Sequence, residues 1–257
     1  TDIVVSESYP GSGWTRGNVE WDIWVPEGMA VAFHSASGDL DAKKLVNPIT
    51  IHTASGDVKL KDLTGELKAQ TASGDIVLEN GKGTAEIRSA SGDVTILGGE
   101  MELAVAIASG DIEINAAAGS MKVRTASGDI KMRDAKGAGS IQSASGDVDV
   151  RALTVTGSWT MTAVSGSVIA CLAGTADHDM KLSAVSGSVL LDYKGHTLKG
   201  SFEVMSAVHR GEIRSSEKGD RDTVFVRGTK FDRLSFSRGE TPHIQLKTHS
   251  GTVEIRR

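Results

Sequence analysis

The tetrapeptide Ala-Ser-Gly-Asp occurs seven times in this chain, and its glycines follow one another at a constant interval of eighteen residues. Self-similarity at a short, fixed period is typical of repeat proteins, in which each unit packs only on its neighbours. We therefore expect a stack of near-identical coils, whose function lies on a long regular surface instead of in one deep pocket. The repeated glycines are Gly38, Gly56, Gly74, Gly92, Gly110, Gly128 and Gly146.

Apolar residues occupy fixed positions relative to that glycine. They fall seven and five residues before it and two and four residues after it, as Ala85, Ile87, Val94 and Ile96 do in one coil. Alternation of apolar and polar residues at period two is typical of a strand with one buried face. Each coil is therefore predicted to hold two short strands, one on either side of the Ser-Gly-Asp turn. A second glycine, such as Gly65, marks the opposite turn.

The predicted fold is an all-β, single-domain parallel β-solenoid (β-helix) that spans residues 1–257, with about eighteen residues and two strands per coil. Residues 31–214 form its stacked coils. Neighbouring coils would lie about 4.8 Å apart, so that about ten or more coils make a rod on the order of 50 Å long. The crossover preference of parallel strands favours a right-handed coil.

Both ends of a solenoid expose unpaired backbone and core, and they need caps. Residues 1–30 contain Trp14, Trp21 and Trp24, and the run 19–25 alternates like a strand. We expect these aromatic side chains to cover the first coil. Residues 215–257 are predicted to hold an irregular segment, which could cap the other end, followed by a last coil at Gly251.

Composition excludes several classes of function. The net charge of −5 leaves no basic footprint for nucleic acid. No run of about eighteen apolar residues exists, so we predict no membrane span in this chain. A single cysteine, Cys171, rules out an internal disulfide. No dinucleotide loop, nucleophile elbow or metal-ligand spacing of histidines is found, so we predict no catalytic residues and no bound cofactor.

The chain resembles a known bacterial family in three places. A strand-like segment, Trp-Asp-Ile-Trp-Val-Pro-Glu-Gly at 21–28, leads into the repeated Ser-Gly-Asp units, and the chain closes on Thr-His-Ser-Gly-Thr-Val-Glu-Ile at 248–255. This combination is similar to the β-strand-repeat domain of unknown function labelled an adhesin and also called the toastrack domain. The resemblance covers roughly residues 19–257. It implies the repeat fold and a scaffold role in the bacterial cell envelope or at the cell surface, and it brings no catalytic residues.

Stacking would place the aspartates of the repeat in one row along an edge of the rod. Neighbouring carboxylates about 4.8 Å apart repel each other by roughly 1 kcal/mol in water, so something must offset the repulsion. One interpretation is structural, with each carboxylate accepting backbone N–H groups within its own turn. The alternative is a line of calcium sites. The candidates are Asp39, Asp57, Asp75, Asp93, Asp111, Asp129 and Asp147.

Two later coils carry apolar residues where the other coils carry charged residues or alanine. Ile169, Cys171 and Leu190 replace charged residues at outward positions, and Val164 and Val185 replace the alanine of the turn. Contiguous exposed apolar residues are typical of a contact site. The alternative is that the segment 215–240, or the loop 173–180, folds back over them.

The sequence therefore predicts a non-enzymatic scaffold or adhesin-like binding module whose partner is a protein or a surface glycan. Two other functions stay open. One is a calcium-binding solenoid that uses the row of aspartates. The other is a β-helix enzyme acting on polysaccharide, which would need acidic residues clustered in a groove.

Overall fold

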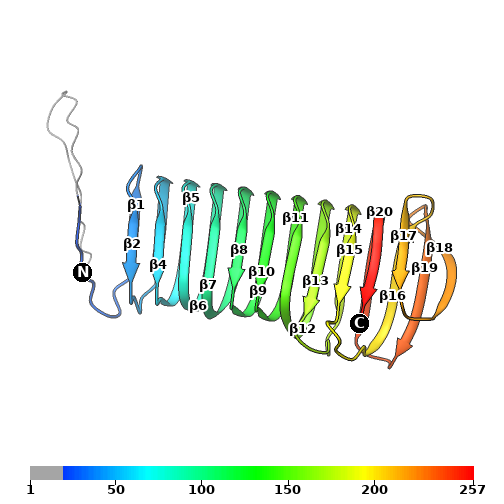
Figure 1. Cartoon of the computed structure of the whole chain (residues 1–257). Coiled ribbons are helices and arrows are strands. Elements are labelled where there is room, and N and C mark those ends of the chain that lie inside the picture. Colours follow the sequence, from blue (N-terminus) through cyan, green and yellow to red (C-terminus); the bar gives the residue numbers. More distant parts are fainter. Residues whose placement is uncertain (1–19) are drawn as a thin grey trace.

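The structure is a computed structural model that describes residues 20–257 as one β-solenoid (Figure 1). Its strands are β1 (Val31–Ser35), β2 (Leu40–Lys43), β3 (Ile49–Ser55), β4 (Val58–Lys61), β5 (Thr64–Ser73), β6 (Ile76–Ser91), β7 (Val94–Ser109), β8 (Ile112–Asn115), β9 (Ala118–Ser127), β10 (Ile130–Arg133), β11 (Lys136–Ser145), β12 (Val148–Ser165), β13 (Val168–Leu172), β14 (Met180–Ser186), β15 (Val189–Asp192), β16 (Gly200–Ala207), β17 (Gly211–Ser215), β18 (Asp220–Val226), β19 (Thr229–Arg238) and β20 (His243–Arg256).

The parallel register confirms the predicted coil. Ile51 pairs with Ala69, and Ile87 pairs with Val105, so that each residue lies beside its equivalent eighteen positions further along the chain. Each coil carries one strand segment before the Ser-Gly-Asp turn and one after it, which builds two long parallel faces. We call them the pre-turn face and the post-turn face. Coils run across the rod and stack along it (Figure 1).

The core follows from the alternation of the sequence. Ile87 and Val94 are fully buried, as are their equivalents in the neighbouring coils, and the intervening side chains point outward. Each Ile, Val or Leu side chain that is fully buried contributes about 1.5–3 kcal/mol to the stability of the fold. The stack of coils is therefore held together mainly by its continuous apolar interior.

The turn opposite the Ser-Gly-Asp edge is formed by a residue in the left-handed backbone conformation. Asp62, Asn80, Ala116 and Asp134 have φ between 52° and 55°, and each stands eighteen residues, or a multiple of eighteen, from the next. A left-handed backbone costs an L-residue roughly 1–2 kcal/mol. This row was not predicted, because its residues share a conformation but no side-chain type.

The predicted N-terminal cap differs from the structure. Residues 20–26 form no strand, and the side chains of Trp21 and Trp24 are 56% and 95% exposed. The expectation that these two tryptophans cover the first coil is therefore wrong, while Trp14 lies outside the described residues. In the first coil, Val31 and Phe33 are only partly buried.

The C-terminal end departs from the simple stack. The parallel strand β20 lies between the coil of β14 and β15 and the coil of β16 and β17 (Figure 1). Beyond them, β19 pairs antiparallel with β16, and β18 pairs antiparallel with β19. The coil at Gly251 is thus the last in the sequence but not in space, and the hairpin β18–β19 ends the sheet. No helix long and apolar enough to cross a membrane occurs among residues 20–257.

Candidate functional site

The aspartates of the repeat form the predicted row, and they bind the backbone of the next coil. The Oδ1 atom of Asp57 accepts the N–H of Asp75 at 3.0 Å, and the Oδ1 atom of Asp75 accepts the N–H of Asp93 at 2.8 Å. The same bond links each of the seven aspartates to the coil that follows. The expectation that each carboxylate binds within its own turn is therefore wrong: the bond connects coils.

Serine continues this row where aspartate is absent. Asp147 accepts the N–H of Ser167, the hydroxyl of Ser167 accepts the N–H of Ser188, and the hydroxyl of Ser188 accepts the N–H of Thr252. A hydroxyl oxygen can take the place of a carboxylate oxygen because the backbone donor needs only an acceptor at that point. This substitution explains how the later coils keep the stack without a charge.

The calcium hypothesis concerns the same seven carboxylates. Within residues 20–257, no group of three or more His, Cys, Asp and Glu side chains is arranged to hold a metal ion. The ladder aspartates have no ion-pair partner among the described residues, so their charges line one edge of the rod. Calcium prefers six to eight oxygen ligands, and calcium binding by this row stays a prediction.

The predicted apolar patch is split between two parts of the surface. Val164 and Val185 lie at the turn edge and are 47% and 45% exposed. Ile169 and Leu190 lie side by side on the post-turn face, where both are half-buried. The five residues named from the sequence therefore do not form one surface.

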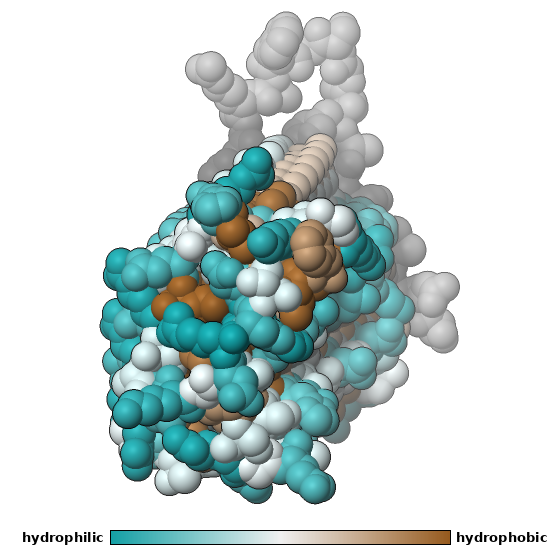
Figure 2. Space-filling view, turned by 90° about the vertical axis from the view of Figure 1, so that its right-hand side faces the viewer, coloured by the Kyte–Doolittle hydropathy of each residue, from teal (hydrophilic) through white to brown (hydrophobic). Residues whose placement is uncertain are grey.

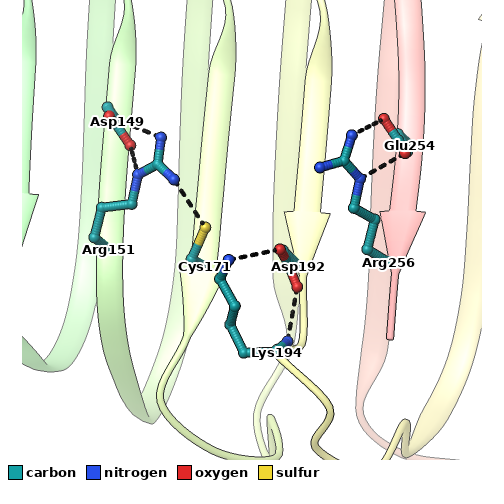
Figure 3. A network of polar contacts seen from close by, with 7 residues as sticks. All are labelled: Asp149, Arg151, Cys171, Asp192, Lys194, Glu254 and Arg256. Carbon is teal, nitrogen blue, oxygen red and sulfur yellow. Dashed lines mark hydrogen bonds and ion pairs between the residues drawn. The ribbon is translucent and has the colours of Figure 1, made fainter.

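Cys171 is buried, with 2% of its surface exposed, so the expectation that it is an exposed contact residue is wrong. Its Sγ atom lies 3.5 Å from a guanidinium nitrogen of Arg151, which also binds Asp149 (Figure 3). On the other side, Cys171 pairs in register with Asp192. The long side chain of Arg151 covers the thiol, which sequence position alone does not reveal.

Asp192 belongs to the same polar network (Figure 3). Its carboxylate accepts the backbone N–H of Lys194 at 2.7 Å and lies 3.1 Å from the ammonium group of that lysine. Burial alone would raise the pKa of Asp192. The backbone N–H and the ammonium group of Lys194 together outweigh burial and hold the pKa below its ordinary value. Acids and bases are matched across this network, which makes it a neutral, structural part of the face.

A groove that sequence reasoning missed lies on the pre-turn face near the C-terminal end. It has a volume of about 670 Å³. Its floor comes from β14, β20 and β16, and its wall comes from the hairpin β18–β19. We call it the hairpin groove. It is lined by Lys181, Ser183, Ala184, Val185, Glu203, Met205, Val224, Val226, Arg227, Thr229, Arg233, Gln245, Lys247 and His249.

The hairpin forms the wall of the groove because the side that it turns toward β16 is apolar. Met205, Ala207 and Phe231 form a small buried cluster outside the main core, and Val224 and Val226 pack against it. Viewed along the rod, this end of the molecule shows hydrophobic patches between hydrophilic side chains (Figure 2). The groove depends on the antiparallel pairing of β16 with β19, which the eighteen-residue period does not predict.

A second hollow of about 500 Å³ adjoins the hairpin groove and shares Lys181, Glu203 and Gln245 with it. In it, the hydroxyl of Ser201 and the Nδ1 atom of His243 lie 2.6 Å apart. A catalytic triad needs an acid that orients the imidazole. The carboxylate of Asp179 instead accepts the backbone N–H of His243.

One family model, Toastrack DUF4097, matches residues 15–118 and 101–220, which together cover more than half of the chain. No curated protein and no solved structure matches the chain significantly. The matched segments hold every copy of the Ser-Gly-Asp turn that keeps the eighteen-residue interval. The resemblance seen in the repeat is thereby confirmed, and the chain belongs to the Toastrack family of β-strand-repeat domains of unknown function.

Proposed function

We propose that this domain is a non-enzymatic scaffold of the bacterial envelope that holds a binding surface at its C-terminal end. The observation that carries the proposal is the hairpin groove, where the regular stack stops and a concave surface begins. Val185 lines that groove and is half exposed, and Val164 lies one coil away on the same turn edge. Exposed apolar residues beside a concavity are typical of contact sites.

The regular coils have the surface expected of a spacer. On their outer faces, charges of opposite sign pair two residues apart on the same strand, as in Lys68 with Glu66 and Arg88 with Glu86. Such exposed pairs contribute about 0–1 kcal/mol each and keep these faces hydrated. A hydrated, repeating surface supports a role in which the rod sets the distance between its ends.

The proposal includes an envelope location and an adhesin-like role, which the resemblance to the adhesin-labelled repeat domain implies. The partner in this proposal is a protein or a surface glycan that contacts Val164 and Val185. The half-buried pair Ile169 and Leu190 offers a smaller contact on the opposite face, between the ion pairs of Asp149 with Arg151 and of Glu254 with Arg256.

The test is cosedimentation of the purified chain with bacterial cell envelopes. We expect Val164→Asp and Val185→Asp each to reduce the bound fraction several-fold, because a charge at an apolar contact must lose its hydration. Ala90→Asp is the matched control, since Ala90 occupies the equivalent exposed turn position in a regular coil. Equal loss in all three variants, or in none, would contradict the proposal. Release of reducing sugar from the envelopes would instead support the alternative function, a β-helix enzyme that acts on polysaccharide.

A further inference from the structure

The hairpin groove collects positive charge from three separate elements. Lys181 comes from β14, Lys247 from β20 and Arg227 from the turn between β18 and β19. In the described residues, no carboxylate lies within ion-pair distance of any of the three. The ammonium group of Lys247 lies over the ring of Phe231, 4.3 Å from its centre, which fixes it in the groove.

The acid in the groove is already engaged. Glu203 accepts a hydrogen bond from the side-chain amide of Gln245 at 2.8 Å and lies 3.5 Å from a guanidinium nitrogen of Arg233. Arg233 is also paired with Asp222. Glu203 and Asp222 share this one guanidinium, so their network keeps a single net negative charge, which is outnumbered by the three positive charges of Lys181, Lys247 and Arg227.

The positive charges of Lys181 and Arg227 repel the positive charge of Lys247. Burial lowers the pKa of Lys247, and the positive charges of Lys181 and Arg227 lower it further, against a smaller opposing effect of Glu203. Free cations on a surface normally spread apart into water, but these are placed by the pairing of β14 with β20 and by the position of the hairpin turn. A bound negative charge would relieve the repulsion among them.

The same groove has an apolar side. Val185, Met205 and Val226 line it beside the cations. Its volume falls in the range of about 300–1,000 Å³ that is usual for small-molecule sites. A ligand that satisfies both sides needs a negative head and an apolar body.

We propose that the hairpin groove binds an oxyanion, a carboxylate or a phosphate, that is carried on an apolar chain. Lys181, Lys247 and Arg227 hold the head group through charge-assisted hydrogen bonds. Val185, Met205 and Val226 contact the chain. This inference rests on the proposed function, in which the groove is part of the contact surface, and it adds the chemical class of the ligand.

The test is calorimetric titration of the whole chain with two probes, octanoate and octyl phosphate, below their micelle concentrations. We expect saturable binding of at least one probe, and the tighter one identifies the head group. The Kd should rise about tenfold or more in Lys247→Gln and in Lys181→Gln, because each removes a charged hydrogen bond. Added salt should weaken binding, and octyl glucoside, which lacks charge, should bind much less well.

The matched control is Lys122→Gln. Lys122 occupies the same outward position in its coil, six residues before the turn glycine, as Lys181 does, but it lies on a regular part of the face. An equal loss of affinity in Lys122→Gln, or no saturable binding of either probe, would overturn the proposal. Binding of a short acidic peptide without binding of either probe would overturn it in favour of a peptide site.

Val164 separates this inference from the proposed function, because it does not line the groove. If Val164→Asp leaves envelope binding intact while Lys247→Gln weakens the binding of the probes, the proposed contact surface is contradicted and the oxyanion site is supported. If envelope binding depends on Val164 but the probes do not bind, the oxyanion site fails alone.

Discussion

The Oδ1 atom of Asp93 accepts the backbone N–H of Asp111 at 2.8 Å, although the two residues are eighteen positions apart. Each aspartate of the repeat makes this bond to the coil that follows it. A row of carboxylates that would repel one another in isolation is thus also a row of acceptors that holds the turns in register. The bond needs one oxygen and does not need the charge.

Replacing Asp93 tests that distinction. We expect Asp93→Ala to lower the free energy of unfolding by about 1 kcal/mol, because the N–H of Asp111 loses its acceptor. Asp93→Asn keeps an acceptor oxygen and should change stability little. Urea unfolding measures both. If Asn is as damaging as Ala, the charge and not the hydrogen bond holds the edge.

Calcium should leave the stability of the rod unchanged if the carboxylates act as acceptors for the next coil. We expect the same Tm in EDTA and across a millimolar calcium series. A ligand at a hundred times its Kd adds about 2.7 kcal/mol, so binding would be easily seen. A rise in Tm that disappears when several ladder aspartates are changed to serine would establish the calcium sites and refute the structural interpretation.

Gly92 is confined by the coil before it as well as by its own backbone. Its φ is 115°, and a Cβ atom there would lie 2.3 Å from the carbonyl oxygen of Gly74. We expect Gly92→Ala to cost about 3 kcal/mol or more, because an unfavourable φ and a clash with backbone add together. Gly228→Ala is the control: its φ is 81°, but the space around it is open, so it should cost only about 1–2 kcal/mol. Similar losses in the two variants would show that close contact between coils is unimportant.

The stability of the turn opposite the Ser-Gly-Asp edge should increase when a left-handed residue in it is replaced by glycine. We expect Ala116→Gly to raise the free energy of unfolding by about 0.5–1 kcal/mol, because glycine adopts the φ of 54° without strain. Ala104→Gly, within the strand β7, should lower it by a similar amount. Chemical denaturation compares the two. A loss in both variants would mean that Ala116 is not strained.

Mild acid should destabilise the C-terminal end through His249. Burial and the neighbouring charge of Lys247 hold the pKa of His249 below its ordinary value. The unfolded chain then binds a proton that the folded chain does not, so the stability present above about pH 6.5 falls as the pH drops toward the folded pKa. Thermal unfolding between pH 7.5 and 5 should show a smaller fall in His249→Gln than in the wild type. His178→Gln, at an exposed position, is the control, and an unchanged pH profile in His249→Gln would contradict the assignment.

The repeat was enough to predict the coil, because a fixed interval specifies which residues stack. Ile87 and Val94 are buried where the alternation places them. The interval does not specify hydrogen-bond partners, so it gave the row of aspartates but not the bond from Asp93 to the next coil. It also does not specify side-chain conformations, which is why the cover that Arg151 gives to Cys171 was missed.

The hairpin groove was beyond the reach of the sequence for a different reason. Lys181, Arg227 and Lys247 are distant in the chain, and they meet because β20 inserts between two coils and β19 reverses direction beside β16. Neither pairing follows from an eighteen-residue period. Non-local strand pairing of this kind has no signature in a short window of sequence.

The insertion of β20 also bears on how the molecule is made. A growing chain on the ribosome can add coils one after another as far as β15, since each new coil finds its neighbour already formed. The segment that follows, β16 to β19, emerges before the strand it must rest on, because β20 comes after it in the chain. The open end of the rod therefore stays unsealed until β20 has been synthesised, and a chain cut short before β20 would expose an unpaired strand edge that can associate with other copies.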